Sequence, residues 1–422
     1  MNATLGDHDA ALLCEALDAA PPCSVRANPA RHHVPDGERV PWCEHGRYLD
    51  KRPVFTLDPF FHAGAYYVQE ASSMMVEQAF KATDLADKEI LALDLCAAPG
   101  GKSGHLRNLL HSSSLLISNE VIPARAAVLA QNLWKQGAEN TLITQQQATF
   151  FGRWRERFDL VLLDAPCSGE GLMRKDHFAR RQWSPGLVTQ CANVQRELLG
   201  EAWNALRPGG SLLYSTCTWS PEENGIQIAS FCEREKAEVV AVPVQPSWHI
   251  RTGDLGLHCY PHESRGEGFF LSLLRKPGDR GQHPKERDGG GADLLERNGI
   301  VYSLSRQWQR LALEMWEADS RSVPGLPIAV SEEDRWTPHP AAAYSARVQG
   351  LLAPFVPFNV LDLDHGQALT VLRGESLRTG DAHGWALARY EGAGLAWMKG
   401  AGGRWNNHLP KALRIRMRPH GV

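Results

Sequence analysis

Two cysteines stand out because each lies in a short turn of small and polar residues directly after an apolar run. Cys167 belongs to Asp164-Ala-Pro-Cys-Ser-Gly169, and Cys217 belongs to Ser215-Thr-Cys-Thr218. Functional side chains collect in such turns, whereas a lone cysteine is more often a small buried apolar residue. A thiolate in such a turn is a nucleophile that can form a covalent intermediate, which divides one difficult step into easier ones.

This chemistry suits methylation of carbon 5 of cytosine, which is a poor nucleophile on its own. A thiolate that adds to carbon 6 turns the ring into an enamine, and carbon 5 can then attack the methyl group of a sulfonium. An acid such as Asp164, if it is protonated, would assist the addition through a hydrogen bond to ring nitrogen 3. The target base has to leave its stack to reach such a pocket.

A glycine turn, Asp94-Leu-Cys-Ala-Ala-Pro-Gly-Gly-Lys102, follows an earlier apolar run and suits a bound cofactor. Its glycines allow close backbone approach, and the free amides of the helix that it opens suit a carboxylate or a phosphate. Glu120 closes the next apolar run, where an acid usually binds a ribose diol, and Asp164 closes a later one. Each feature alone is common at the end of a strand that binds no ligand. The three in register predict an adenosyl cofactor, S-adenosylmethionine.

Alternating apolar runs and helical patterns must position these residues. The expected strands share continuous apolar character and cover residues 89–97, 115–121, 141–147, 158–166 and 211–218. Helices are expected over 102–110 and 123–137, and from Ser184-Pro185 to the Arg207-Pro-Gly-Gly210 turn. This alternation predicts an α/β fold with a Rossmann-like parallel sheet, helices on both faces, and ligands at the carboxyl ends of the strands. The strands that precede the two cysteines are expected to be neighbours beside the cofactor strand.

Composition sets broad limits on the 422-residue chain. No apolar run approaches the roughly 18 residues needed to cross a bilayer, and the N-terminus does not read as a secretory signal, so we expect a cytoplasmic protein. The nine cysteines contain no CxxC pair, so neither a disulfide framework nor a structural zinc site is expected. The net charge of −3 gives no global support for a nucleic-acid partner.

The end of the chain is nevertheless basic. From Lys399 onward there is no acidic residue, and the basic ones are Lys399, Arg404, Lys411, Arg414, Arg416 and Arg418. This segment could lie along phosphates, or it could be a solvated basic end, and composition does not choose between the two.

The motifs DLCAAPGGK, DAPCSGEG and YSTCT, in this order, resemble the Sun-type, nucleolar-protein-related family of RNA cytosine-5 methyltransferases. The similarity extends from about Leu12 to Lys276. It includes residues 24–28, 62–73, 174–176, 207–210, 221–224 and 266–270. Within the family, the chain is most similar to the bacterial branch that methylates 16S ribosomal RNA. Members of that branch carry a C-terminal PUA-like RNA-binding domain, and Trp397-Met-Lys-Gly400 and residues 407–414 resemble its end.

The resemblance implies roles for individual residues. Cys217 matches the nucleophile, and Cys167 matches the cysteine that helps to release the methylated RNA. The positions that match cofactor contacts are Cys96, Ala97, Ala98, Pro99, Gly100, Gly101, Lys102, Glu120 and Asp164. The chain departs from the family at Gln147, which stands where an acid usually meets the adenine end of the cofactor. An amide can still donate and accept a hydrogen bond there.

The resemblance also implies a domain order. We expect an N-terminal RNA-binding extension over 1–73, a methyltransferase core over 74–277, a linker over 278–299 and a PUA-like RNA-binding region over 300–422. The linker assignment rests on a stretch rich in glycine and charge. The expected partner is RNA, most of all 16S rRNA or the small ribosomal subunit, without a membrane or a metal, and the expected state is a monomer.

Other functions fit some of these residues. A DNA cytosine-5 methyltransferase would use Cys167 as the attacking residue, but the second cysteine and the basic tail argue against it. Gln147 favours a non-catalytic RNA-binding ribosome-assembly factor, but the two intact cysteines argue against it more strongly. Transfer RNA is an alternative substrate. An NAD-dependent oxidoreductase is disfavoured because the turn lacks the GxGxxG spacing.

Overall fold

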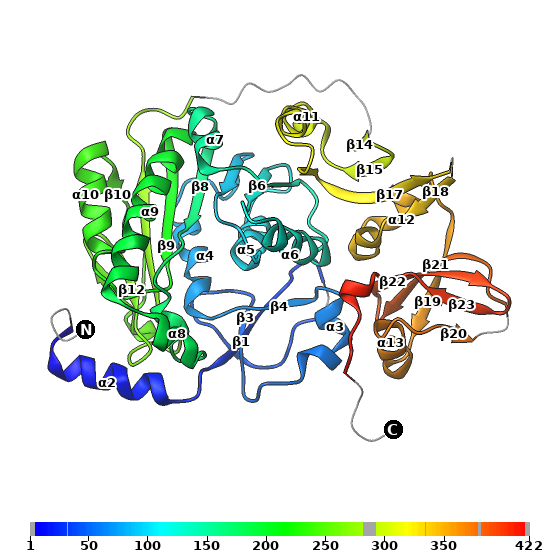
Figure 1. Cartoon of the computed structure of the whole chain (residues 1–422), viewed down its shortest axis with the longest axis horizontal. Helices are drawn as coiled ribbons and strands as arrows, with labels where there is room; N and C mark the ends of the chain where they lie inside the picture. Colours follow the sequence, from blue (N-terminus) through cyan, green and yellow to red (C-terminus); the bar gives the residue numbers. More distant parts are fainter. Residues whose placement is uncertain (1–4, 32, 282–292, 334, 379–380, 418–422) are drawn as a thin grey trace.

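The computed structural model describes residues 5–31, 33–281, 293–333, 335–378 and 381–417, and a ten-stranded sheet forms its centre (Figure 1). The strand order is β11-β12-β13-β9-β8-β5-β6-β7-β16, with β10 paired to β13. The parallel strands are β5 (Leu91–Asp94), β6 (Leu115–Asn119), β7 (Thr141–Thr144), β8 (Phe158–Asp164) and β9 (Leu206–Thr216). The antiparallel strands on one side are β10 (Glu238–Val239), β11 (Arg251–Gly253), β12 (Gly256–Cys259) and β13 (Phe269–Arg275). The predicted α/β fold with a Rossmann-like sheet is confirmed.

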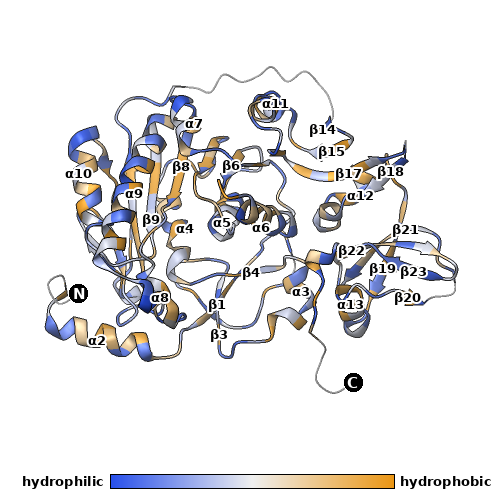
Figure 2. Cartoon of the chain, in the orientation of Figure 1, coloured by the Kyte–Doolittle hydropathy of each residue, from blue (hydrophilic) through white to orange (hydrophobic). Residues whose placement is uncertain are grey.

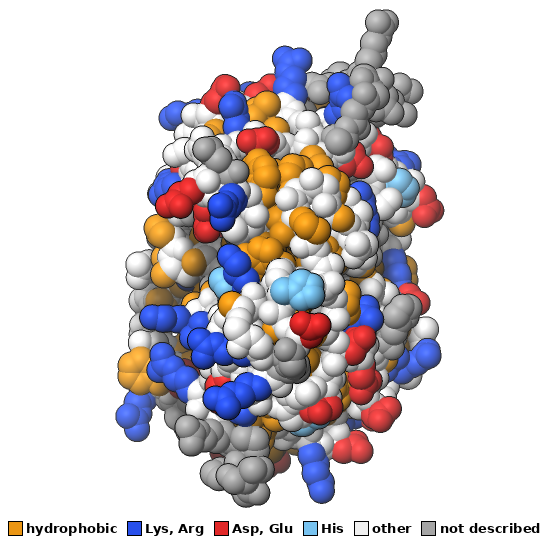
Figure 3. All heavy atoms as spheres, turned by 90° about the vertical axis from the view of Figure 1, so that its right-hand side faces the viewer, with side chains coloured by type: hydrophobic (Ala, Val, Ile, Leu, Met, Phe, Trp, Pro, Cys, Tyr) orange, Lys and Arg blue, Asp and Glu red, His pale blue; other side chains and the backbone are white. Residues whose placement is uncertain are grey.

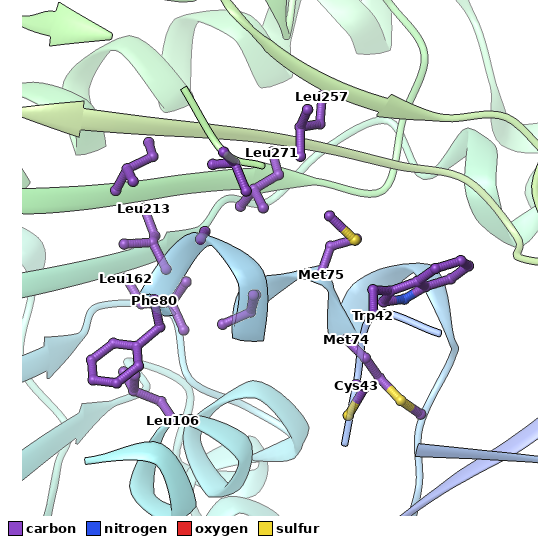
Figure 4. Packing of buried hydrophobic residues seen from close by; sticks show 14 of the residues in the cluster. Trp42, Cys43, Met74, Met75, Phe80, Leu106, Leu162, Leu213, Leu257 and Leu271 are labelled. Atoms are coloured by element: carbon purple, nitrogen blue, oxygen red, sulfur yellow. The ribbon is translucent and has the colours of Figure 1, made fainter. Parts of the chain in front are cut away.

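Two apolar layers cover the sheet. One layer holds α4 (Val76–Lys81) and α5 (Gly101–Leu109), whose Phe80 and Leu106 point toward Leu162 and Leu213 of the sheet (Figure 4). The other layer holds α7 (Ala148–Arg153), α9 (Pro185–Ala205) and α10 (Gly225–Glu235). The strands β8 and β9 between these layers are almost fully buried, and β8 is largely apolar (Figure 2), as expected for a strand buried on both faces. Within the described residues, no helix is both long and apolar enough to cross a membrane.

The five parallel strands end two or three residues before their predicted ends, and the differences at β7 and β9 bear on the site. The strand β7 ends at Thr144 rather than at residue 147, so Gln147 lies outside it and precedes α7. The helix α9 begins at its Ser184 N-cap as predicted and ends at Ala205. The Arg207–Gly210 stretch, which we expected to be a turn, already belongs to β9, and the β8–β9 pairing shifts register there.

The N-terminal residues form a helix and a small sheet that lie beneath the central sheet in Figure 1. The helix α2 spans Asp7–Asp18. The sheet has the order β2-β3-β1-β4, from β2 (Glu38–Arg39), β3 (Gly46–Leu49), β1 (Cys23–Ala27) and β4 (Tyr66–Val68), and the short α3 (Pro59–His62) precedes β4. The Asn28 amide donates to the carbonyls of Gly64 (3.0 Å) and Gln136 (3.1 Å), which joins this sheet to the end of α6 (Pro123–Lys135).

The residues after the expected linker first return to the core. Residues 282–292 of that linker lie outside the described residues. The helix α11 (Gln309–Ala318) packs in the apolar layer of α7 and α9, and β16 (Val323–Pro324) pairs with β7 at the edge of the central sheet. A four-stranded sheet is then built from β14 (Leu294–Arg297), β15 (Ile300–Ser303), β17 (Leu326–Glu332) and β18 (Arg335–Pro338). The predicted division into domains stays a prediction.

A five-stranded sheet ends the described chain. It contains β19 (Phe358–Leu363), β20 (Leu377–Arg378), β21 (Gly384–Tyr390), β22 (Ala393–Ala401) and β23 (Arg404–Asn407). The helix α13 (His365–Leu372) lies between β19 and β20. The capping box of Asp364 and Gln367 begins this helix, and burial of Leu369 and Leu372 holds it against the sheet.

Candidate active site

The two cysteines singled out in the sequence meet at the carboxyl end of the central sheet. Cys167 follows β8 and Cys217 follows β9, and their Sγ atoms lie 3.2 Å apart. The strands β8 and β9 are hydrogen-bonded neighbours, with Asp164 opposite Ser215, so their ends deliver both thiols to one place. Both cysteines are partly buried. The structure therefore brings the two predicted thiols into direct contact.

This contact shifts the pKa values of the two thiols in opposite directions. The hydrogen bond from Cys167 lowers the pKa of Cys217, and the Lys102 ammonium acts in the same direction. The same hydrogen bond, together with burial, raises the pKa of Cys167. A thiolate is the nucleophilic form of cysteine, so this arrangement favours Cys217 as the reactive sulfur and Cys167 as the protonated partner.

A buried carboxylate holds the Cys167 turn in place. Glu223 has no exposed surface, and its Oε2 atom accepts hydrogen bonds from the Ser168 amide (3.0 Å) and the Gln195 side chain (2.8 Å). Gln195 also donates to the Pro166 carbonyl (2.9 Å). Burial raises the pKa of Glu223. Glu223 belongs to a motif that the resemblance includes, but sequence reasoning gave it no role, because nothing in a lone acidic residue shows which turn it supports.

A glycine and a second carboxylate hold the Cys217 turn. The Gly171 amide donates to the Cys217 carbonyl (2.7 Å), and the Thr218 hydroxyl donates to Oε2 of the buried Glu170 (2.7 Å). A Cβ atom on Gly171 would lie 2.8 Å from that carbonyl oxygen. Only glycine fits this approach without a shift of the backbone, so the two cysteine turns are fixed against each other.

The predicted cofactor turn connects β5 to α5. Gly100 has a φ of +107° and is the N-cap of α5, whose first amides face the end of the sheet. Contacts hold the outer side of the turn: the Ala97 amide donates to the Asn119 carbonyl (2.8 Å), and Asn132 donates to the Pro99 carbonyl (2.7 Å). Cys96 is partly buried, and burial raises its pKa. The free amide ends of α5 give this turn the character of an anion-binding site.

Asp94, the last residue of β5, is a site residue that sequence reasoning did not assign. It is fully buried, and its Oδ2 atom accepts a hydrogen bond from Ser103 (2.6 Å). Its Oδ1 atom has no hydrogen-bond partner in the described part of the chain. Burial raises the pKa of Asp94 to about 7. An unpartnered buried carboxylate oxygen is costly, so its position beside the glycine turn fits a ligand that brings a donor or a positive charge.

Glu120 lies at the end of β6, as predicted, and is 3% exposed. Its Oε1 atom accepts a hydrogen bond from the Ile122 amide (2.9 Å), and its Oε2 atom lies 3.2 Å from Arg125. Arg125 also donates to the Ala98 carbonyl (3.0 Å), which links Glu120 to the glycine turn. The carboxylate is therefore oriented at the strand end where a ribose diol would be recognised.

Gln147 is exposed and occupies the N-cap of α7 without forming a side-chain cap. Asn119 holds the end of β7 and the two residues that separate it from Gln147, because its Oδ1 atom accepts from the Thr144 hydroxyl (2.9 Å) and from the Gln146 amide (2.9 Å). The side chain of Gln147 thus stays free to turn toward the end of the sheet.

Lys102 connects the glycine turn to the thiols. Its ammonium donates to Asp164 Oδ2 (2.8 Å), and the Ser215 hydroxyl donates to Asp164 Oδ1 (2.9 Å). The attraction of the Asp164 carboxylate raises the pKa of Lys102 against the effect of its burial. Of the residues predicted from sequence, the structure thus gathers Lys102, Asp164, Cys167 and Cys217 into one site.

The N-terminal sheet closes on the same turn. The guanidinium of Arg26 is buried, donates to Gln69 Oε1 (2.8 Å) and reaches the Gly101 carbonyl at 3.4 Å. The ring of Tyr67, on β4, lies so close that a Cβ atom on Gly101 would be 3.0 Å from it. The sheet over residues 23–68 therefore forms one wall beside the cofactor turn.

Three family models match the chain. The model described as 16S rRNA methyltransferase RsmB/F matches residues 82–275. The N-terminal domain of 16S rRNA methyltransferase RsmF matches residues 1–71, and the methyltransferase RsmF PUA domain matches residues 358–415.

Curated relatives carry the name ribosomal RNA small subunit methyltransferase F. The protein from Aeromonas hydrophila is 31% identical over 89% of this chain and 85% of its own length, and that from Shewanella loihica is 30% identical over 89% and 83%. The protein from Aeromonas salmonicida is 38% identical over 57% of this chain, and the matched segment spans about half (52%) of that relative.

Solved structures share the fold. A methyltransferase homologue from Pyrococcus horikoshii is 27% identical, with a TM-score of 0.55 over 64% of this chain and 91% of its own. The NSun6 protein from the same organism, solved with SFG, has a TM-score of 0.55 over 66% of this chain and 97% of its own, at 20% identity.

Proposed function

The chain belongs to the 16S rRNA methyltransferase RsmB/F family, and from this premise we propose that it methylates carbon 5 of a cytosine in 16S rRNA. The observation that carries the proposal is the pair of thiols, 3.2 Å apart, at the strand ends beside the cofactor turn. Methylation of a ring nitrogen, an exocyclic amine or a ribose hydroxyl needs no sulfur nucleophile. A cysteine with a lowered pKa is what activation of carbon 5 requires.

The first step is the attack of Cys217. Its thiolate adds to carbon 6 of the unstacked cytosine, and the electron pair of the ring double bond moves toward carbon 5 and ring nitrogen 3. Asp164 accepts hydrogen bonds from Lys102 and Ser215, so it can donate to ring nitrogen 3 only as a protonated acid that gives up one of these bonds. Carbon 5 would then take the methyl group: its new bond to the methyl carbon replaces the bond from that carbon to the sulfonium sulfur, which would leave as a neutral thioether.

The last step is release of the product. A base accepts the proton from carbon 5, the electron pair of that bond restores the ring double bond, and the bond between carbon 6 and Cys217 breaks. We assign the release to Cys167, because its thiol already hydrogen-bonds the sulfur that must leave. Its raised pKa keeps Cys167 protonated, so its thiol can hydrogen-bond the Cys217 sulfur as that sulfur leaves as a thiolate.

The cofactor of this site is S-adenosylmethionine, which supplies the methyl group. The residues fit it on two observations: the unpartnered Oδ1 atom of Asp94 and the glycine turn that leaves the amides of α5 free. We assign Asp94 and the Gly100–Lys102 turn to its amino-acid end, Glu120 to its ribose and Gln147 to its adenine. The predicted contacts at Cys96, Ala97, Ala98 and Pro99 line the same turn.

The C-terminal sheets are proposed to hold the RNA outside the site. Figure 3 shows hydrophobic side chains gathered in the middle of the face on the right of Figure 1, with lysine and arginine side chains beside them. On this part of the chain, the Lys399 ammonium lies 5.2 Å from the ring centroid of Trp385. Such pairs suit stacked bases and phosphates. Of the basic tail predicted to follow phosphates, Arg418 lies outside the described residues. The cytoplasmic location and the monomeric state stay predictions.

Single-cysteine variants test the reaction. We expect Cys217→Ala to abolish methyl transfer, and Cys167→Ala to accumulate a covalent protein–RNA adduct that a denaturing gel retains. Full activity of Cys217→Ala would contradict the assignment of the nucleophile. An adduct formed by Cys217→Ala but not by Cys167→Ala would mean that the two roles are exchanged, as in the DNA-methyltransferase alternative.

The substrate is tested by bisulfite sequencing of ribosomal and transfer RNA from a deletion strain and its parent. Loss of one or a few 16S rRNA cytosine signals supports the proposal, and loss of a transfer-RNA signal instead would assign the other substrate. Unchanged signals in both RNAs would favour a non-catalytic assembly factor.

A further inference from the structure

A cavity of about 510 Å³ lies between the N-terminal sheet and α6, outside the thiol site. The residues that line it and bear on its chemistry are Arg52, Phe55, Phe61, Tyr66, Tyr67 and Lys135. The wall is thus aromatic on one side and basic at two positions. Neither the proposed reaction nor the proposed cofactor site uses this cavity.

Three rings form a continuous aromatic wall. The ring centroids of Phe55, Phe61 and Tyr66 lie 6.0 Å from one another. Phe55 and Tyr66 are buried in a small apolar cluster, whereas Phe61 is only partly buried. A rigid aromatic wall with one accessible ring is the surface on which a nucleobase stacks, whatever its sequence.

Two cations lie over this wall. The Lys135 ammonium is 5.6 Å from the ring centroid of Phe61, and the Arg52 guanidinium is 5.3 Å from that of Phe55. No ion pair of either cation with a carboxylate is found among the described residues. Burial lowers the pKa of Lys135, which shows that its charge is poorly solvated. An anion at this place would relieve that cost, so the cavity suits a ligand with both an aromatic ring and a negative charge.

Two residues of the cavity, Tyr67 and Arg52, relate it to the surroundings of the thiol site. Tyr67 lines the cavity, packs against Gly101 and lies within electrostatic range of Lys102. Arg52 also lines a second cavity, of about 430 Å³, together with Arg174 and Arg265. Arg174 lies three residues after Gly171, whose amide contacts the Cys217 turn, so one arginine of the second cavity belongs to the segment that supports this turn.

We propose that this aromatic cavity binds one nucleotide of the RNA strand that carries the target cytosine. The base stacks on Phe61, and its phosphate is neutralised by Lys135 and Arg52. The strand would then pass along the arginine-lined cavity, and its target nucleotide would reach the thiols. This inference rests on the proposed function only in that the substrate is RNA. A neutral apolar ligand is disfavoured, because it would leave the charge of Lys135 without compensation.

The test is binding of a fluorescein-labelled single-stranded oligoribonucleotide of mixed sequence to the full chain, read by fluorescence anisotropy without S-adenosylmethionine. We expect Lys135→Gln to weaken binding several-fold and to reduce the slope of log affinity against log salt by about 0.7, the value for one phosphate on a single strand. We expect Phe61→Leu to weaken binding by about fivefold or more with an unchanged slope. Phe61→Tyr keeps the ring and should restore binding.

Matched controls separate stacking and charge from folding. Lys88→Gln removes an exposed lysine that pairs with Asp84 just before β5, at the amino end of the parallel strands rather than at the carboxyl end that holds the thiols, and should leave binding unchanged. An abasic oligonucleotide offers no ring, so Phe61→Leu should bind it as the wild type does. Thermal unfolding of each variant shows that the compared proteins are folded.

Three outcomes would overturn the inference. Wild-type binding by both Lys135→Gln and Phe61→Leu would show that the cavity does not hold RNA. An equal loss on abasic RNA would show that the ring acts through packing alone. Tight AMP binding that both variants lose, with RNA binding intact, would assign the cavity to a free nucleotide. If the wild type bound no RNA at all, the proposed function itself would fall, which is a different result.

Discussion

Replacing Gly171 with alanine should slow methyl transfer without changing cofactor affinity. The Gly171 amide donates to the carbonyl of Cys217, the proposed nucleophile. A Cβ atom at residue 171 would lie 2.8 Å from that oxygen and 3.0 Å from the Gly268 carbonyl oxygen. Both contacts are with backbone, which cannot rotate away as the end of a flexible side chain can.

The size of the effect follows from these distances. Ordinary contact with a Cβ atom begins at 3.4 Å, so the Cys217 turn must retreat by about half an ångström. A misplacement of about 1 Å at a reacting group can cost about 100-fold in rate. We therefore expect kcat for Gly171→Ala to fall by about 10- to 100-fold, and stability to fall by about 1–3 kcal/mol from overpacking.

The assay is transfer of a tritiated methyl group to 16S rRNA, with cofactor affinity measured by calorimetry. Gly200→Ala is the matched control, because a Cβ atom on Gly200, within α9, meets nothing within 4 Å. It should keep full activity and gain up to about 1 kcal/mol of helix stability. A folded Gly171→Ala enzyme with wild-type kcat would refute the reasoning, and so would a lost cofactor affinity at normal kcat.

Three further predictions concern Asp94, Gln147 and Gly64. Burial raises the pKa of Asp94 from 3.8 to about 7. Between these two pH values the native state holds a proton that the unfolded chain releases. The free energy of unfolding should therefore fall by up to about 4 kcal/mol as pH rises from 4 to 7. Asp94→Asn should remove that slope in urea unfolding, and an unchanged slope would contradict the assignment. Gln147→Asp should raise the affinity for S-adenosylmethionine about fivefold, because a carboxylate forms a charge-assisted hydrogen bond, and Gln147→Ala should lower it. Calorimetry measures both affinities, and equal values would exclude this contact. At Gly64, an added Cβ atom would combine a φ of +68° with overlap of the Lys135 carbonyl, whereas Gly392 has a φ of +81° and no neighbour within 4 Å. The thermal midpoint of Gly64→Ala should therefore lie well below that of Gly392→Ala. Equal midpoints would show that the overlap costs nothing.

The central sheet and the meeting of the two thiols could be predicted because local signals carry them. Continuous apolar runs mark the buried parallel strands, and the turn after each strand contains the reactive residue. Once Cys167 and Cys217 are placed on neighbouring strands, the geometry of a parallel sheet brings them together. Their distance follows from topology rather than from any contact between distant residues.

The residues that hold the cysteine turns and the cofactor turn in place could not be predicted in the same way. Glu223 acts through Ser168, 55 residues away in the chain, and Arg26 reaches Gly101 across 75 residues. Buried acids and arginines have no periodicity that reveals their partners. The helix α13 also lacks a clear signal, for a local reason: its eight residues, which include Gly366, are too few to show a helical period.

The pairing of β16 with β7 has a consequence for synthesis of the chain. Val323 lies opposite Ile143 in an antiparallel pairing, so the strand that covers this edge of the central sheet leaves the ribosome long after the parallel strands. Until then β7 presents unpaired amides and carbonyls, which is the kind of edge that joins to the edge of another molecule. A chain truncated before residue 323 would keep every residue of the thiol and cofactor sites and still expose this edge. We expect this truncated chain to self-associate during expression, because of its exposed edge, rather than to lose the residues that catalyse the reaction.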